Sequence, residues 1–254
     1  MDMDYTRWLG RLRDQAAGDR TIFCLPYGGG GTSTFHGWRT AAPGWLEIAP
    51  VRLPGREQRL AEPPGFQPAD IASAIAAQAD RSYAIFGHSL GALVGFEVIR
   101  ALRLLGAPQP LHFYVAAARP PDVPDPVAAA VGFGDDKFIA ALIELIGAPA
   151  ALRDEPELRE LALPALRSDL RWLHEYAYRL EPAFAVPLTA LAGADDALFG
   201  PADMLGWGRF TSSAFRLETV PGGHFFPQAD AARVVGMIAA SLAAERAQAA
   251  GSPR

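Results

Sequence analysis

The chain has 254 residues, of which half are hydrophobic and a fifth are charged, and its formal net charge is −5 at pH 7. This apolar content excludes a disordered or fibrous chain and can fill the core of one large domain, which we expect to span residues 1–254. The acidic balance without blocks of like charge argues against nucleic acid as a partner.

Targeting signals and cysteine content suggest a cellular setting. The amino terminus, MDMDYTRWLG, has neither the basic segment nor the apolar run of a secretory signal, and no later stretch is apolar for long enough to span a membrane. The single cysteine, Cys24, cannot form an internal disulfide or a multi-cysteine metal site. We therefore expect a cytoplasmic protein without a membrane partner, and we expect it to be a monomer.

Short apolar runs alternate with helical patterns along the chain. This alternation predicts the α/β class, with a mostly parallel sheet flanked by helices. The predicted strands lie at 21–27, 47–53, 83–87, 111–117, 187–192 and 215–220. The predicted helices lie at 34–41, 69–80, 90–105, 201–208 and 229–248.

One interval departs from the alternation, because residues 119–186 separate two strands where a single crossover helix would suffice. The interval opens on the Pro-rich segment RPPDVPDP and continues with helical patterns such as DDKFIAALIELIG. We interpret residues 121–182, approximately, as a helical lid over the carboxyl edge of the sheet, where open α/β sheets bind ligands. A helical elaboration with a purely structural role is the alternative.

The clearest motif is Gly87-His88-Ser89-Leu90-Gly91, which directly follows the predicted strand YAIF and precedes a helical run. A G-x-S-x-G sequence in this strand–turn–helix context is typical of the nucleophile elbow of α/β-hydrolases. The pattern predicts Ser89 as a nucleophile on a strained turn. We expect His88 to serve in packing rather than in catalysis.

A serine hydroxyl needs a base to take its proton and an acid to orient that base. Among the five histidines, His224 follows the last predicted strand, where this fold places its base, and the chain order is serine, acid, histidine. The loop after the strand at 187–192 offers two acids, of which Asp196 is favoured over Asp195 by its G-x-x-D spacing. Asp122, between prolines, is a weaker third candidate.

Negative charge that develops on the carbonyl oxygen needs fixed N–H donors. We expect one from the backbone of Leu90, the residue after the nucleophile, and a second from the loop LPYGGGGTSTF, assigned to Tyr27 with Gly28 as the alternative. The glycine run also suggests a phosphate loop, but no Lys-Ser/Thr pair follows it, so neither nucleotide-binding pattern fits.

Several separate blocks make the chain resemble the type II thioesterases of polyketide synthase and nonribosomal peptide synthetase systems, nearly from end to end. These blocks are LPYGGGGTSTFHGW, VRLPGREQR, GHSLGA, LPALRSDLRWLHEYAY, ALAGADD and GGHFF. Carried over by position, the resemblance implies the α/β-hydrolase fold and a catalytic set of Ser89, Asp196 and His224.

The resemblance also implies a function. The expected substrate is an acyl group in thioester linkage to the phosphopantetheine arm of an acyl or peptidyl carrier protein, and the expected role is the hydrolysis of stalled or aberrant acyl groups. The reaction would pass through an acyl-Ser89 intermediate without a cofactor, and no cluster with metal-ligand spacing predicts a metal. A product-releasing thioesterase, or a carboxylesterase on free small esters, is the alternative.

Apolar residues of the predicted lid are candidates for lining an acyl chamber, with packing of the lid onto the sheet as their other possible role: Phe138, Leu142, Leu145 and Trp172. Because carrier proteins are usually acidic and this chain is acidic too, docking should use local basic residues. Arg56 and Arg59 are candidates for that docking.

Overall fold

The computed structural model describes residues 7–9, 20–78 and 82–251, the last six of them without side chains. Its centre is a six-stranded sheet in the order β2-β1-β3-β4-β5-β6, in which every neighbouring pair is parallel. The strands are β1 (Arg20–Leu25), β2 (Leu46–Pro50), β3 (Tyr83–His88), β4 (Phe113–Ala116), β5 (Leu188–Gly193) and β6 (Phe215–Val220). All six predicted strands are therefore confirmed, with ends shifted by a few residues.

The helices alternate with these strands as the sequence predicts. The α-helices are α1 (Trp38–Ala41), α2 (Pro68–Ala76), α3 (Leu90–Leu104), α4 (Asp135–Ile146), α5 (Ala151–Asp154), α6 (Pro156–Glu175), α7 (Pro201–Met204), α8 (Phe226–Ala229) and α9 (Ala231–Gly251). The 3₁₀ helices are η2 (Thr32–Phe35), η3 (Glu57–Arg59), η4 (Ala128–Gly132) and η5 (Leu205–Phe210).

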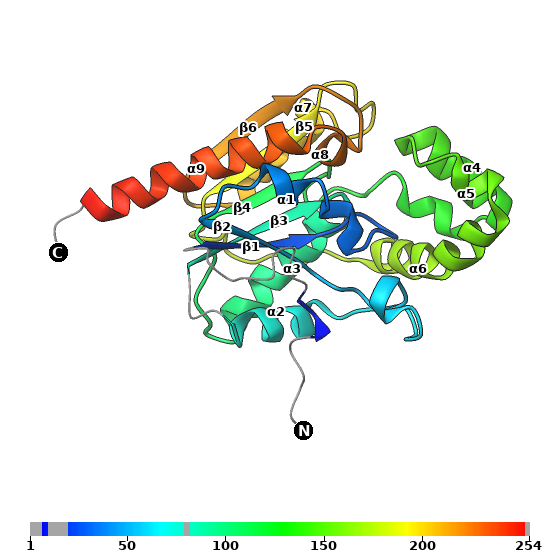
Figure 1. The fold of residues 1–254 in the computed structure, drawn as a ribbon, viewed down its shortest axis with the longest axis horizontal. Helices are drawn as coiled ribbons and strands as arrows, with labels where there is room; N and C mark the ends of the chain where they lie inside the picture. The colour runs from blue at the N-terminus through cyan, green and yellow to red at the C-terminus, as the bar shows by residue number, and fades with distance from the viewer. Residues whose placement is uncertain (1–6, 10–19, 79–81, 252–254) are drawn as a thin grey trace.

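Helices cover both faces of the sheet, α2 and α3 on one side and α1 and α9 on the other (Figure 1). Strand side chains alternate between the two cores because successive residues of a strand point to opposite faces. In β1, Phe23 and Leu25 pack with α2 and α3, whereas Ile22 and Cys24 pack with Trp38 of α1. Cys24 is thus a buried strand residue, as its apolar surroundings in the sequence suggest.

Three predicted helices differ in detail from the structure, and residues 79–80 of the helix predicted at 69–80 lie outside the described residues. The segment predicted at 34–41 is the 3₁₀ helix η2 followed, after a break, by the short helix α1. The segment predicted at 201–208 is α7 followed by the 3₁₀ turns of η5. Gly206 and Gly208 lie in those turns, and glycine is a poor former of α-helix. The segment predicted at 229–248 is α9, preceded by the separate short helix α8, with Asp230 between them in a non-helical conformation.

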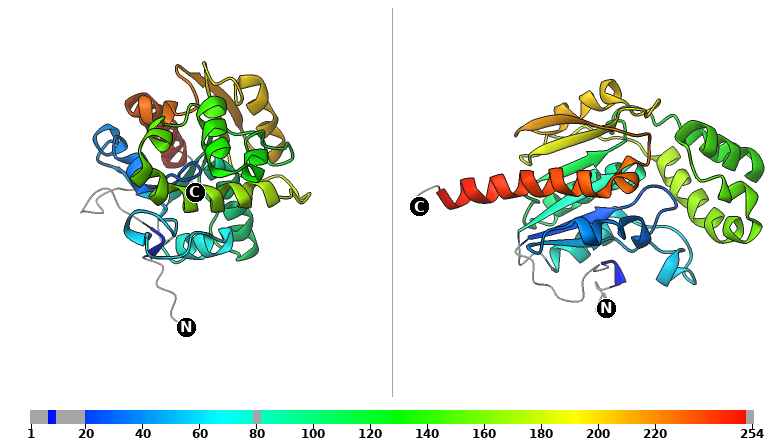
Figure 2. Two further views of the ribbon diagram at one scale, coloured as in Figure 1. Left: turned by 90° about the vertical axis from the view of Figure 1, so that its right-hand side faces the viewer. Right: turned by 45° about the horizontal axis from the view of Figure 1, so that its top comes forward.

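The interval between β4 and β5 holds η4, α4, α5 and α6, which group together beyond one end of the sheet (Figures 1 and 2). Helix α6 turns an apolar stripe inward, with Leu166, Leu170 and Leu173 at helical spacing and all buried. The carboxylate of Asp169 lies within that stripe and is fully buried.

Among the described residues, no helix has the length and apolar character needed to cross a membrane.

Candidate active site

Ser89 lies between the end of β3 and the start of α3, in a backbone conformation that residues other than glycine rarely adopt. Its φ is 56° and its ψ −121°, a combination that costs energy for any residue other than glycine. The turn is fixed because the Ser89 N–H donates to the Ala116 carbonyl at 2.8 Å and the Ala92 N–H donates to the Ser89 carbonyl at 2.9 Å. Strand and helix therefore hold the hydroxyl in place.

The two glycines of the motif are required by close backbone contacts. A Cβ atom on Gly87 would lie 2.2 Å from the carbonyl oxygen of Gly91, and one on Gly91 would lie 2.3 Å from that of Leu25. Neither position has room for a side chain. The G-x-S-x-G pattern thus reflects how tightly α3 packs on β1 and β3 behind Ser89.

The side chains of Asp196 and His224, which come from two different loops, meet beside this turn. The His224 Nδ1–H donates to Asp196 Oδ2 at 2.9 Å, and both side chains are 2% exposed. Asp196 Oδ1 accepts the backbone N–H groups of Leu198 and Phe199, each at 3.2 Å. Burial opposes ionisation of the carboxyl, but these hydrogen bonds, that of His224 foremost, lower the pKa of Asp196 below its ordinary value.

The same contact leaves the other ring nitrogen of His224 available. His224 Nε2 is buried, and it has no hydrogen-bond partner among the described residues. A buried polar atom without a partner is unusual and costs stability. Such an atom is what a general base presents to a nucleophile or to a substrate.

Packing between the two loops explains why Asp196 reaches His224. The Ala194 N–H donates to the Val220 carbonyl at 2.8 Å, and the Asp195 N–H donates to the Gly222 carbonyl at 2.9 Å. A Cβ on Gly193 would lie 2.7 Å from the Gly222 carbonyl oxygen, so this position also needs glycine. The side chain of Asp195 is exposed.

Two other polar residues from the sequence analysis lie in different settings. Asp122 accepts hydrogen bonds from the exposed guanidinium of Arg209, at 2.7 and 2.8 Å, whereas His224 pairs with Asp196. His88 is fully buried, its Nε2 lies 2.8 Å from the His224 carbonyl oxygen, and its ring packs edge-on against Tyr27. Burial, and then the neighbouring His224, lower the pKa of His88 to about 3.

A narrow cavity with a volume of about 50 Å³ opens onto Ser89. Its walls come from the elbow, the glycine-rich loop, the β4–β5 interval and the loop of His224. They consist of Tyr27, Gly28, Ser89, Leu90, Asp125, Val127, Leu142, Ile146, Ala148, Pro149, Leu152, Leu166, Leu170, Leu173 and Phe225. The structure thus places Leu142 with Ser89, Leu90, Tyr27 and Gly28, five residues that the sequence analysis singled out.

The expected N–H donors are placed by the ends of β1 and β3. Leu90 is the first residue of α3, and the first N–H groups of a helix have no acceptor within it. Tyr27 follows β1, its ring packs edge-on against Phe225, and its carbonyl accepts the Gly30 N–H at 2.8 Å. Both residues line the Ser89 cavity.

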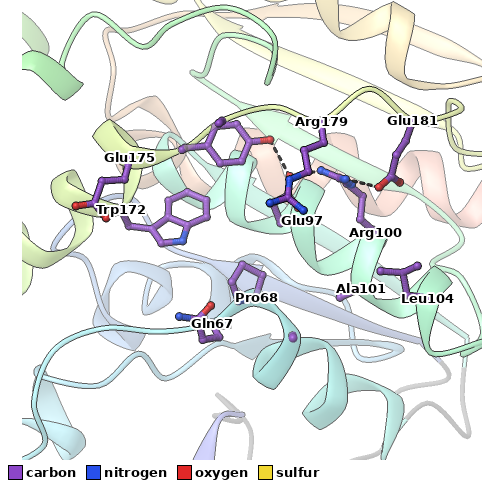
Figure 3. Close-up of a pocket in the computed structure, with 13 residues that line it drawn as sticks. Gln67, Pro68, Glu97, Arg100, Ala101, Leu104, Trp172, Glu175, Arg179 and Glu181 are labelled. Atoms are coloured by element: carbon purple, nitrogen blue, oxygen red, sulfur yellow. Dashed lines mark hydrogen bonds and ion pairs between the residues drawn. The ribbon is translucent and has the colours of Figure 1, made fainter.

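Three residues expected to line an acyl chamber do not line this cavity. Phe138 is fully buried beneath the Arg167 guanidinium, 4.1 Å above its ring, and Leu145 is 37% exposed on the outer side of α4. Trp172 packs against Phe66 and Tyr176. It lines a separate groove, with a volume of about 550 Å³, and Figure 3 shows Trp172 among the residues of this groove.

Neither basic residue proposed for docking is free to serve in that role. Arg56 is 7% exposed, and its guanidinium binds both carboxylate oxygens of Asp169, at 2.6 and 2.9 Å. Arg59 pairs with Glu62 and stacks over the ring of Trp8 at 4.5 Å. The docking expectation for Arg56 is therefore wrong, because the side chain is used inside the protein.

Two carboxylates near the cavity, buried Asp169 and half-buried Asp125, were not predicted from the sequence. Asp125 lines the cavity, accepts the Val127 N–H at 2.8 Å, and has a pKa raised by burial. Asp169 lies in the block LPALRSDLRWLHEYAY, where an acid between apolar residues at helical spacing is a signal for a buried ion pair. Asp125 sits among prolines, where neither periodicity nor a motif indicates which way its side chain points.

No group of three or more His, Cys, Asp or Glu side chains suited to a metal ion occurs in the part of the chain that the structure describes.

Comparison with known proteins gives a consistent picture. The family model described as "Thioesterase domain" matches residues 20–242. The "Linear gramicidin dehydrogenase LgrE" of Brevibacillus parabrevis is 31% identical and covers 93% of each chain. Two solved structures are also similar. The RedJ thioesterase of the prodiginine pathway of Streptomyces coelicolor has a TM-score of 0.79 at 33% identity, covering 88% of this chain and 90% of that one. The type II thioesterase BorB of the borrelidin biosynthetic cluster has a TM-score of 0.80 at 30% identity, covering 91% of this chain and 96% of that one.

Proposed function

The chain belongs to the thioesterase domain family and is a hydrolase that acts on thioester bonds, and we propose that Ser89, His224 and Asp196 form its catalytic triad. The observation that carries the proposal is the buried Asp196–His224 hydrogen bond, whose second ring nitrogen lacks a partner among the described residues. In the same fold, the turn between β3 and α3 presents Ser89 to a cavity.

The reaction would proceed in two halves. Ser89 Oγ attacks the thioester carbonyl carbon while His224 Nε2 takes the hydroxyl proton, and the N–H groups of Leu90 and Tyr27 donate to the oxygen that becomes negative. Collapse of the tetrahedral intermediate breaks the C–S bond, and His224 gives its proton to the departing thiolate. Water, deprotonated by His224, then attacks the carbonyl carbon of the acyl-Ser89 ester. Collapse of this second intermediate breaks the C–Oγ bond, His224 returns the proton to Ser89 Oγ, and the carboxylic acid is released.

We propose that the substrate is an acyl group on the phosphopantetheine arm of an acyl or peptidyl carrier protein in polyketide or nonribosomal peptide biosynthesis. Relatives with names from these pathways support this assignment, since the match extends over nearly the whole of both chains. The role would be editing, that is, removal of stalled or aberrant acyl groups. Residues 121–182 would act as a lid, since their helices supply much of the cavity wall.

The decisive experiment compares three substrates with the same acyl group: an acyl-carrier protein, the free pantetheine thioester and a nitrophenyl ester. An editing thioesterase should have a markedly lower KM for the carrier-bound form, because the carrier surface adds binding energy. Equal kcat/KM for the carrier and the nitrophenyl ester would indicate a carboxylesterase instead. Intact mass of the wild type and of Ser89→Ala during turnover should show the acyl adduct only where Ser89 is present.

The glycine-rich loop does not favour a nucleotide-dependent reaction, although one relative is named a dehydrogenase. The Asp169 carboxylate accepts the N–H of Gly29, and the Glu57 carboxylate accepts those of Thr32 and Ser33. A pyrophosphate at this loop would meet two negative charges that already hold the N–H groups it needs. Hydrolysis at Ser89 is the function that this loop supports.

The expected monomer and its cytoplasmic location remain predictions. Light scattering on the purified protein tests the first, and fractionation of the producing cell tests the second.

A further inference from the structure

The glycine-rich loop begins with a tight turn whose geometry the local sequence leaves undecided. The Gly30 N–H donates to the Tyr27 carbonyl at 2.8 Å, and Gly29, the third residue of the turn, has a φ of +80°. These are features of a type II turn, which differs from type I by a flip of the central peptide, here Gly28–Gly29. With glycine at both central positions, either orientation is accessible.

A carboxylate from a distant helix selects one orientation. Asp169 Oδ2, from α6, accepts the Gly29 N–H at 2.7 Å, and this N–H belongs to the central peptide of the turn. A type I turn would point the same N–H away from the carboxylate. Asp169 is fully buried, so water cannot replace the Gly29 N–H as a donor to its carboxylate. The alternative turn would therefore leave the buried charge of Asp169 without one of its hydrogen bonds.

Arg56 completes the arrangement from the other side. Its guanidinium binds Asp169 through two nitrogens, and Nη1 also donates to the Gly30 carbonyl at 3.2 Å. A two-pronged pair of this kind fixes direction as well as distance. The ion pair therefore forms hydrogen bonds with the turn at two points, the N–H of Gly29 and the carbonyl of Gly30.

The same stretch of α6 also forms the cavity wall. Leu166 and Leu170, which flank Asp169, both line the Ser89 cavity. A Cβ on Gly28 would lie 3.3 Å from Leu170 Cδ1, and one on Gly29 would lie 2.5 Å from Leu166 Cδ2, so α6 packs directly on the turn. The position of α6 and the conformation of the turn are thereby linked.

We propose that Asp169, together with Arg56, is a positioning residue: by fixing the Tyr27–Gly30 turn when α6 is packed on the sheet, it holds Tyr27, the first residue of that turn and the proposed second oxyanion donor, beside Ser89. Asp169 does not touch the reacting atoms; it acts through the Tyr27–Gly30 turn. The inference rests on the proposed thioesterase mechanism. It couples closure of the proposed lid to completion of the oxyanion site, so the chemical step would be fast only with α6 in place.

The test compares Asp169→Asn and Asp169→Ala with a control on the same group of helices. The control is Asp135→Asn, which removes the carboxylate partner of Arg167 on α6 and leaves the glycine turn untouched. Arg167 Nη2 lies 2.6 Å from Asp135 Oδ1, and the guanidinium also donates to two backbone carbonyls. Active sites are titrated with a fluorophosphonate that labels Ser89, and kcat and KM for an acyl-pantetheine thioester are expressed per titrated site. Affinity for an alkyl boronic acid, whose serine adduct carries a tetrahedral oxyanion, is measured in parallel.

We expect Asp169→Asn to lower kcat per titrated site by about 10- to 100-fold with little change in KM, since full loss of an oxyanion donor costs about 10²- to 10³-fold. Boronic acid affinity should fall in parallel, and Asp135→Asn should change neither. Arg56→Lys should give a smaller loss than Arg56→Ala, because lysine keeps the charge but not the two-pronged geometry.

Two results would overturn the inference. One is a variant that loses titratable sites but keeps kcat per site, which indicates a purely structural role. The other is an equal loss in Asp135→Asn, which indicates general loosening of the helices. Failure of the proposed function itself is distinguishable, because then the wild type would not hydrolyse the thioester at all.

Discussion

At the residue scale, the proposed chemistry depends on one buried hydrogen bond between the loops after β5 and β6. In the proposed triad, Asp196 fixes the ring of His224 so that Nδ1 carries the proton and Nε2 would act as the base. The neighbouring Asp195 has an exposed side chain and takes part through its backbone. Two adjacent aspartates therefore offer a matched pair of variants.

Asp196→Asn should reduce turnover by about 10⁴-fold, because the amide favours the wrong tautomer of the base. Asp195→Asn should be mild. Single-turnover hydrolysis of an acyl-pantetheine thioester measures both effects. If the two variants ranked in the opposite order, Asp195 would be the acid.

A second residue-scale prediction concerns His88. Its pKa is lowered from the ordinary 6.5 to about 3 by burial and by His224. Unfolding therefore takes up a proton between those pH values, and stability falls as the pH drops from 6.5 towards 3, by at most about 1.4 kcal/mol per pH unit. His88→Gln can keep a donor to the His224 carbonyl and should flatten this slope.

Urea unfolding between pH 4.5 and pH 7 measures that slope. His36→Gln is the control, because His36 is exposed. An unchanged slope in His88→Gln would show that other groups cause the acid sensitivity.

At the element scale, α4 and α6 bring side chains over the sheet to make the cavity. Leu142 of α4 is 1% exposed and lines the cavity, whereas Leu145, one turn further along, is 37% exposed and does not. The two leucines have the same chemistry and differ in orientation. Comparing their alanine variants therefore separates an effect on substrate preference from the general effect of losing a leucine side chain.

Leu142→Ala should lengthen the preferred acyl chain and also destabilise the fold by about 2–5 kcal/mol, because it removes a buried side chain from a packed site. Leu145→Ala should do neither. kcat/KM across a series of acyl chain lengths, together with urea unfolding, tests both claims. The same chain-length profile in Leu142→Ala and wild type would exclude Leu142 from the acyl site.

At the scale of the whole molecule, the scaffold and the site are held by different contacts. Helix α9 packs along the sheet through Val234, Val235, Ile238 and Leu242, and the Leu242 carbonyl accepts a hydrogen bond from Arg20 at the start of β1. None of these residues lines the Ser89 cavity. The core beneath α9 therefore stabilises the fold without shaping the site.

Ile238→Ala should cost about 2–5 kcal/mol of unfolding free energy while leaving kcat per titrated active site unchanged. Thermal unfolding and fluorophosphonate titration supply the two measurements. A fall in kcat per titrated site would mean that α9 acts on the site through the sheet.

The sequence by itself determined the order of strands and helices, the elbow and the identity of the acid and base candidates. These follow from local physics: apolar periodicity, glycines that must sit where backbones touch, and a chain order that places loops at one edge of a parallel sheet. For the same reason Ser89, Asp196 and His224 could be singled out without any contact being known.

The tertiary structure alone decided which side chains of the β4–β5 interval face the cavity. Periodicity marks Phe138, Leu142 and Trp172 equally as apolar, but the rotation and tilt of each helix decide which of them face Ser89. It also decided that Arg56 pairs with Asp169 rather than facing solvent. Arg56 and Asp169 are 113 residues apart in the sequence. Their pairing depends on how α6 packs on the glycine turn, and no local sequence pattern encodes that packing.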